Sequence, residues 1–305
     1  MYKKNLLFSF GGGQNQEKLI NIALKKKIDL LLIEDKKINF DKSQTKQIKL
    51  SCYNLKQVKK KKKLFINCSK NKYTDIIYRS SGPSVLSFWY ISKILNLQRV
   101  SKELAYSVYS KSYFCSILKK NKLPYIDYKI LHKNKKINKF RNFVLKPDAP
   151  IVGKENVYLS QNQNIFNFNK VQNSSHNDKV ICSSYIEGKD FGIFVFINKK
   201  NKKKILLNFF VEKNKFVNCK IKHIGIFKSK ESSLNKKIIY LTKNILKIFP
   251  NYYGFISISY RVTKNTKIYP YEINLGLSGD MIVDKLFKKN TFKKSLYEVE
   301  IENLC

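Results

Sequence analysis

Two oxygen-bearing side chains near the end of the sequence, Glu272 and Asn274, stand two residues apart in the apolar segment 268–275, which Gly276 follows. If this segment is a β-strand, both side chains point to the same side, so a carboxylate and an amide face one place. Such oxygen ligands suit a hard cation like Mg²⁺, which usually also holds substrate phosphates. The pair predicts a cation site; the alternative is a surface strand with two solvated polar residues.

Two lysines, at the end of a predicted strand and at the start of a predicted helix, are candidates for binding phosphate. Lys146 ends the apolar segment 143–145, so its ammonium should be partly desolvated, which is costly unless an anion meets it. Lys111 opens a predicted helix, and the N-terminus of a helix attracts anions. The alternatives are a lysine whose ammonium reaches back to water and an ordinary solvated helix lysine.

The segment 180–190 reads as the end of one strand, a turn at Gly188 and the start of another strand. The backbone N–H and C=O groups of such a connection could bind a flat heteroaromatic ring. Asp190 could accept hydrogen bonds from a ribose. An ordinary strand connection is the alternative.

These residues need a framework of strands and helices. A strand at 5–10, a glycine turn at 11–13, a helix from about residue 15 and a strand at 30–33 predict a parallel βαβ unit. The GxGxxG spacing is absent, so no dinucleotide site is assigned there. The lysine-rich segment 36–72 is predicted as an exposed loop region with short strands. Further strands are predicted at 74–78, 123–131, 143–146, 180–187, 191–197, 205–211, 216–221, 255–262 and 267–273, and helices after residue 84, up to residue 121 and at 233–248.

The charge of the chain is +40, from 61 basic and 21 acidic residues among 305. Only four of the basic residues are arginine, and the abundant Lys, Asn, Ile, Phe and Tyr are encoded by A/T-rich codons. We therefore attribute much of the positive charge to genomic composition, expressed as lysines on a solvated surface. Nucleic-acid binding therefore ranks below a small-molecule function. The six cysteines and three histidines form no zinc spacing, and no segment has the ~20 apolar residues that a membrane span needs. We expect a cytoplasmic protein.

Five short motifs, in order along nearly the whole chain, resemble those of the ATP-grasp superfamily. The glycine segment 11–16 with its βαβ unit resembles the domain that precedes the grasp. The other four motifs resemble the lysine-bearing helix, the phosphate flap, the adenine and ribose hinge, and the metal-binding strand. They are Ser110-Lys111 with the segment 118–124, Val144-Leu-Lys-Pro147 with the loop to Val157, Tyr185-Ile-Glu-Gly-Lys-Asp190, and Tyr271-Glu-Ile-Asn274.

The resemblance implies an α/β plus α+β fold. An N-terminal parallel βαβ pre-ATP-grasp domain would occupy residues 1–102. An ATP-grasp domain with two antiparallel-sheet subdomains would occupy residues 103–305, with a lid subdomain at roughly 112–184. The protein would be a monomer or a homodimer that acts on small-molecule carboxylate and amine substrates and needs no membrane.

The resemblance also implies roles for individual residues. Adenine would be framed by Ser183, Ser184, Tyr185 and Ile186, ribose would be bound by Asp190, and the ATP phosphates would be bound by Lys111 and Lys146. Mg²⁺, or Mn²⁺ in its place, would be held by Glu272 and Asn274, with Ser259 as a weak ligand. With Lys146 and Glu272 as catalytic residues, the protein would be an ATP-dependent carboxylate–amine ligase. It would activate a carboxylate as an acyl phosphate for attack by an amine or a similar nucleophile.

The sequence also departs from the family pattern. Ser259, thirteen residues before Glu272, stands where the family usually has an acidic metal ligand, and Ser183 stands where the hinge usually has an acid. The flap has the single glycine Gly153, and Leu275-Gly276 replaces the common Pro-Arg. Asp280 and Asp284 are candidates for the missing carboxylate. These departures keep a second function open, that of a degenerate nucleotide-binding protein without ligase activity.

Overall fold

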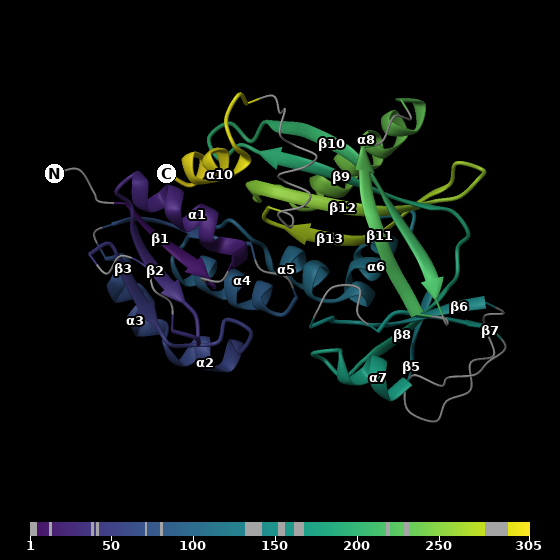
Figure 1. Cartoon of the computed structure of the whole chain (residues 1–305), viewed down its shortest axis with the longest axis horizontal. Coiled ribbons are helices and arrows are strands. Elements are labelled where there is room, and N and C mark those ends of the chain that lie inside the picture. The colour runs from purple at the N-terminus through teal and green to yellow at the C-terminus, as the bar shows by residue number, and fades with distance from the viewer. Residues whose placement is uncertain are drawn as a thin grey trace.

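A computed structural model describes residues 5–11, 14–37, 40, 43–70, 72–79, 82–131, 142–151, 156–161, 168–217, 220–228, 232–277 and 292–305. Among the residues discussed above, Gly153, Asp280 and Asp284 lie outside these ranges. The structure contains two β-sheets, which Figure 1 shows with the N-terminal sheet on the left and the larger sheet on the right.

The N-terminal sheet is parallel and has the strand order β3-β2-β1-β4. Its strands are β1 (Asn5–Phe10), β2 (Asp29–Ile33), β3 (Thr45–Ile48) and β4 (Tyr73–Ile77). Nearly every residue of β1 and β2 is buried, as their continuous apolar runs predict for a sheet covered on both faces. The helix α1 (Gln14–Lys25) connects β1 to β2 and completes the predicted βαβ unit.

The prediction of loops and short strands across 36–72 is confirmed at β3 but is wrong for residues 55–60 and 62–69. The lysine-rich stretch forms α2 (Leu55–Lys60) and α3 (Lys62–Ser69). Val58 on α2 and Phe65 on α3 are fully buried, and the lysines between them face solvent. Both helices pack against α4 (Ser84–Ile94), and the Phe65 ring contacts Phe8 of β1. The run of lysines obscured these two apolar residues in the sequence.

The larger sheet follows the order β13-β12-β9-β10-β11-β7-β6-β8-β5, and all its pairs are antiparallel. It consists of two antiparallel parts that meet where β11 pairs with β7 through Lys220 and Tyr158 alone. The lid part is made of β5 (Tyr128–Leu131), β6 (Asn142–Pro147), β7 (Tyr158–Gln161) and β8 (Val180–Ser184). The other part is made of β9 (Lys189–Ile197), β10 (Lys204–Val217), β11 (Lys220–Lys228), β12 (Gly254–Val262) and β13 (Ile268–Leu275).

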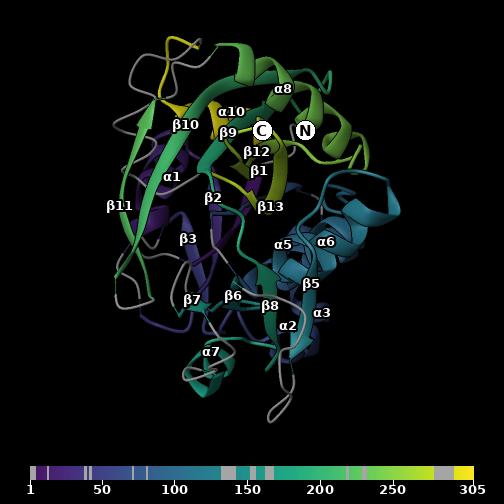
Figure 2. The same ribbon diagram turned by 90° about the vertical axis from the view of Figure 1, so that its right-hand side faces the viewer.

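Strands β10 and β11 differ from the prediction. The two strands expected at 205–211 and 216–221 are one long strand, β10, and the start of the next, β11. Their hairpin reaches from the upper part of the sheet down to the lid, which both views show (Figures 1 and 2). A break in the β10–β11 register between Lys213 and Asn214 gives the hairpin its bend.

The helices cover the sheets and join them. The helix α4 (Ser84–Ile94) is followed by α5 (Lys102–Tyr109) and α6 (Lys111–Lys120), whose N-terminal N–H groups are capped by Ser101 and Ser110. The helix α8 (Ser232–Lys247) packs on β12, where Thr242 bonds to the buried Tyr260 hydroxyl over 2.6 Å. Two helices, α7 (Phe168–Asn173) and α10 (Leu296–Leu304), were not predicted. The last helix packs against α1, β4 and β12 and therefore connects the end of the described chain to the first sheet.

A buried ion cluster joins the two sheets. Arg99, which is fully buried, donates to Asp75 on β4 (3.3 Å) and to Glu300 on α10 (3.2 Å). Asp75 also accepts hydrogen bonds from Lys199 Nζ and from the Tyr253 hydroxyl, each at 2.7 Å. Residues from five places along the chain, at positions 75, 99, 199, 253 and 300, thus meet in one buried cluster.

Candidate functional site

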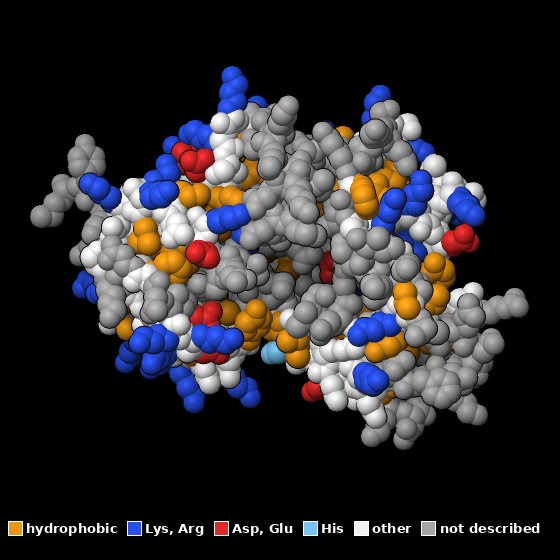
Figure 3. All heavy atoms as spheres, viewed as in Figure 1, with side chains coloured by type: hydrophobic (Ala, Val, Ile, Leu, Met, Phe, Trp, Pro, Cys, Tyr) orange, Lys and Arg blue, Asp and Glu red, His pale blue; other side chains and the backbone are white. Residues whose placement is uncertain are grey.

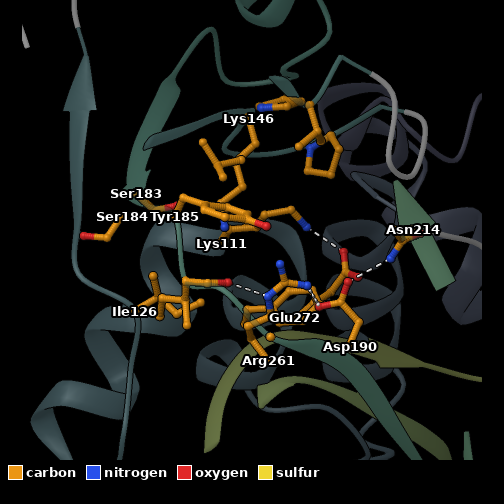
Figure 4. A pocket seen from close by; sticks show the side chains of 17 residues that line it. Lys111, Ile126, Lys146, Ser183, Ser184, Tyr185, Asp190, Asn214, Arg261 and Glu272 are labelled. Atoms are coloured by element: carbon orange, nitrogen blue, oxygen red, sulfur yellow. Dashed lines mark hydrogen bonds and ion pairs between the residues drawn. The ribbon is translucent and has the colours of Figure 1, made fainter. Parts of the chain in front are cut away.

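A pocket of about 320 Å³ lies between the lid strands and the β12–β13 hairpin. Most of the residues assigned above to nucleotide and metal line it. They are Lys111, Lys146, Ser183, Ser184, Tyr185, Ile186, Asp190 and Glu272, and the pocket is also lined by Ile126, Val144, Pro147, Pro150, Val157, Gly188, Asn214, Arg261 and Tyr271. Figure 4 shows Lys146 on the opposite side of this pocket from Asp190, Glu272 and Arg261.

Lys146 presents an unpaired ammonium to the pocket. It lies near the end of β6 and is half-buried, and within the described residues its Nζ has no hydrogen bond or ion pair. Burial lowers the pKa of Lys146, and the nearby Lys111 lowers it further. A half-buried cation beside a second cation is stabilised by an anion, so this corner of the pocket favours a negatively charged ligand.

Lys111 is already paired. Its Nζ lies 2.5 Å from Oε1 of Glu272 on β13, and both side chains are partly buried. The α6 N-terminus that carries Lys111 is fixed by Asp148, which follows the end of β6. The buried Asp148 carboxylate accepts from the Ser110 hydroxyl (2.8 Å) and the Ser112 N–H (2.7 Å), and its carbonyl accepts from the Lys111 N–H (2.9 Å). The start of α6 is thereby held against the lid, which fixes the backbone from which the Lys111 side chain reaches Glu272.

The hinge between β8 and β9 offers backbone groups to the pocket. The N–H groups of Ser184 and Tyr185 donate to the carbonyls of Asp127 and Asn142. The Ile186 carbonyl accepts from Arg261 Nε at 2.7 Å, whereas the Ile186 N–H has no partner in the part of the chain that the structure describes. Ile186 lines the pocket together with Ile126, Val144 and Tyr185, and an unused donor among apolar side chains suits a flat ring with an acceptor on its edge.

Asp190 is held from two sides. Its Oδ1 accepts from Arg261 NH1 at 2.9 Å, and its Oδ2 accepts from Asn214 Nδ2 at 2.8 Å (Figure 4). Neither Arg261 nor Asn214 was singled out in the sequence. Arg261 follows Ser259 by two residues on the same strand, a spacing that could have drawn attention to it. Asn214, at the bulge of β10, carries no such signal.

The predicted metal ligands are only partly brought together. Ser259 lies opposite Glu272 in the β12–β13 register, and Ser257 lies opposite Asn274. Glu272 lines the pocket, but Ser259 and Asn274 do not. Among the described residues no group of three or more His, Cys, Asp or Glu side chains is placed to hold a metal ion. The donor set around Glu272 therefore fits a cation that takes most of its remaining ligands from a bound phosphate rather than from the protein.

Comparisons with known proteins bear on the fold. No family model matches the sequence, and no curated protein sequence matches it. Solved structures do match over nearly the whole chain. An L-amino acid ligase from Bacillus licheniformis is similar with a TM-score of 0.75 and 13% identity, covering 99% of this chain and 74% of the ligase.

Two further structures extend this comparison. A phosphoribosylglycinamide synthetase from Anaerococcus prevotii has a TM-score of 0.68 and 16% identity, with 99% of this chain and 75% of the synthetase covered. An N5-carboxyaminoimidazole synthetase from Staphylococcus aureus, complexed with ADP, has a TM-score of 0.70 and 11% identity, with 99% and 78% covered.

These neighbours are ATP-grasp enzymes, and they share the arrangement of a parallel four-stranded sheet followed by two antiparallel parts. At these identities the likeness concerns the fold. The chain has the ATP-grasp fold.

Proposed function

We propose that the pocket binds ATP and that the protein is an ATP- and Mg²⁺-dependent ligase. The observation that carries this proposal is the half-buried ammonium of Lys146, which has no partner among the described residues and lines a pocket beside Lys111. Two partly buried cations in one pocket favour an anion of high charge density, such as a polyphosphate. The hinge supplies the unused Ile186 N–H to a base, and Asp190 supplies carboxylate oxygens to a ribose.

The proposed reaction is acyl transfer through a phosphorylated carboxylate. A carboxylate oxygen of the substrate attacks the γ-phosphorus of ATP, and the bond to the β-phosphate oxygen breaks to release ADP. An amine then attacks the acyl phosphate, forms an amide and expels inorganic phosphate. Lys146 and Lys111 neutralise the transferring phosphoryl group, and the lid strands keep water from the acyl phosphate. Mg²⁺, held by Glu272 with Asn274 beside it on β13, would neutralise phosphate charge when bound.

The structural neighbours support a ligand and a substrate class. One neighbour was solved with ADP and another is an L-amino acid ligase. Small-molecule carboxylates and amines, amino acids first, are therefore the substrates to screen.

The first experiment measures ADP binding by isothermal titration calorimetry. We expect Lys146→Met to weaken ADP affinity at least tenfold, because the variant removes one cation from the phosphate end without changing the apolar stem. Lys129→Met is the matched control, since Lys129 is an exposed lysine of the same lid on β5. If Lys146→Met binds ADP like the wild type, the phosphate site is elsewhere and the proposal fails.

A second candidate, a nucleotide-binding protein without ligase activity, is favoured by one observation. Of the two carboxylates that line the described pocket, Asp190 is bound by Arg261 and Asn214, and Glu272 is engaged by Lys111. ADP release with carboxylate and amine pairs separates the two functions: turnover supports the ligase. ADP binding without turnover across amino acids and related acids supports the second candidate.

The face shown in Figure 3 does not favour the nucleic-acid alternative. On the face in Figure 3 the Lys and Arg side chains that are coloured lie in separate groups, with acidic side chains among them. The described helices include none long and apolar enough to cross a membrane.

A further inference from the structure

The Lys111–Glu272 ion pair occupies the two side chains that a nucleotide and its metal would both need. The pair joins α6 to β13 across 161 residues of sequence, and both side chains are partly buried in the pocket wall. While Lys111 Nζ lies 2.5 Å from Glu272 Oε1, that ammonium donates to the carboxylate rather than to a phosphate. The same carboxylate oxygen is then unavailable to a cation.

The backbone on each side of the pair is fixed, so only side chains can change partners. The Lys111 N–H donates to the Asp148 carbonyl, and the Asp148 carboxylate holds the neighbouring Ser110 and Ser112. Glu272 sits on β13 opposite Ser259, in the interior of an antiparallel pair. A lysine side chain has four rotatable bonds and can turn toward the adjacent Lys146 corner without moving α6.

The charge around the pair makes such an exchange cooperative. The described ionic residues that line the pocket are three cations, Lys111, Lys146 and Arg261, and two carboxylates, Asp190 and Glu272. Asp190 is neutralised by Arg261, and Glu272 by Lys111. If a phosphate alone drew Lys111 away, the partly buried Glu272 would lose this ion pair while facing a second anion. A divalent cation on Glu272 removes that cost.

We propose, building on the proposed function, that Lys111 and Glu272 are an exchangeable pair: nucleotide phosphate takes Lys111 as one divalent cation takes Glu272. Nucleotide and metal therefore enter together, each raising the affinity for the other. Because Ser259 supplies no carboxylate opposite Glu272, the exchange involves one cation rather than two. Without metal the pair acts as an internal competitor and weakens nucleotide binding.

A double-mutant cycle tests the exchange. Isothermal titration with ADP in EDTA is carried out on the wild type, Glu272→Gln, Lys111→Met and the double variant, each first shown to be folded by circular dichroism. We expect Glu272→Gln to bind ADP about fivefold more tightly than the wild type, because Lys111 is released, a change of ~1 kcal/mol. In the Lys111→Met background the same Gln substitution should give less than half of that gain in free energy.

The cycle separates exchange from simple charge repulsion. Glu187→Gln removes a carboxylate next to the hinge that is largely exposed and paired with Lys264, and it should leave ADP affinity unchanged. An equal gain from Glu272→Gln in both Lys111 backgrounds would mean repulsion alone, and no gain in either would mean that the pair does not compete. Both results overturn the exchange while ADP binding itself stands.

A second measurement covers the metal. Manganese binding in the absence of nucleotide, followed by electron paramagnetic resonance, should be tighter in Lys111→Met than in the wild type, and unchanged affinity refutes the exchange. A wild type that binds no ADP with or without metal refutes the proposed function itself and the exchange with it.

Discussion

The buried Glu300 makes the stability of this fold depend on pH in a direction opposite to that of a paired surface carboxylate. Its side chain is 1% exposed, Oε1 accepts from Arg99, and Oε2 has no hydrogen-bond partner among the described residues. Burial raises the pKa of Glu300 to about 7, and Arg99 reduces this effect without cancelling it. The folded protein therefore keeps a proton that the unfolded chain releases near its ordinary pKa of 4.5.

The sign and size of the effect follow from that difference. Below pH 4.5 both states hold the proton, and the protonated carboxyl contributes its full stability. Between about pH 4.5 and 7 only the folded state holds it, so stability falls as the pH rises. The shift corresponds to ~3 kcal/mol at ~1.4 kcal/mol per pKa unit.

Urea unfolding of the wild type and of Glu300→Gln from pH 4.5 to 8 measures how much the Glu300 proton contributes to the free energy of unfolding. The free energy of unfolding of the variant, relative to the wild type, should rise by roughly 3 kcal/mol across the window, because glutamine stays neutral. Glu302→Gln, on the same helix, is the control: two lysines lower the pKa of the exposed Glu302, so its effect has the opposite sign. Parallel profiles for the wild type and Glu300→Gln would refute the reasoning.

Two further predictions concern the pocket and its surroundings. Gly276→Ala should lower the free energy of unfolding by more than ~2 kcal/mol, because Gly276 has a φ of +80° and an added Cβ would collide with the Tyr78 carbonyl oxygen. In urea unfolding, Gly225→Ala should lower the free energy of unfolding clearly less, because its Cβ would meet only the edge of the Phe227 ring. Arg261→Lys should weaken ADP binding about tenfold in calorimetry, because two different guanidinium nitrogens bind the Ile186 carbonyl and Asp190, and the single nitrogen of a lysine cannot reproduce that planar fork. Wild-type ADP affinity in that variant would show that the two Arg261 hydrogen bonds, to Ile186 and Asp190, are not needed for ADP binding.

Local patterns predicted much of the fold because they carry physical information at short range. The apolar run of β1, ended by Gly11, and the run of β2 could be placed directly, since fully buried strands contain few polar residues. The two lysine-rich helices could not be placed in this way, because lysine occurs in helices and in loops alike. Only the buried Val58 and Phe65 distinguish this stretch from an exposed loop. The length of β10 depends on its partners β9 and β11, which local composition does not show.

The candidate site was predicted as a set of residues but not as a set of contacts. Resemblance of motifs selected Lys111, Lys146, Asp190 and Glu272, and the structure brings all four to one pocket. The Lys111–Glu272 pair spans 161 residues, so nothing local in the sequence predicts that these two side chains meet. Asn274 was predicted from the strand period and from the resemblance of its motif, and it lies outside the pocket lining.

The ion cluster around Arg99 also sets an order for folding during synthesis. Asp75 and Arg99 are made early, but Glu300 follows Arg99 by 201 residues. Until that last helix leaves the ribosome, the first sheet carries a desolvated charge cluster that lacks one of its partners and the cover of α10. The N-terminal sheet should therefore remain less stable through most of translation than it is in the folded chain. A nascent chain stalled before residue 296 should be more sensitive to proteolysis than the chain that includes α10.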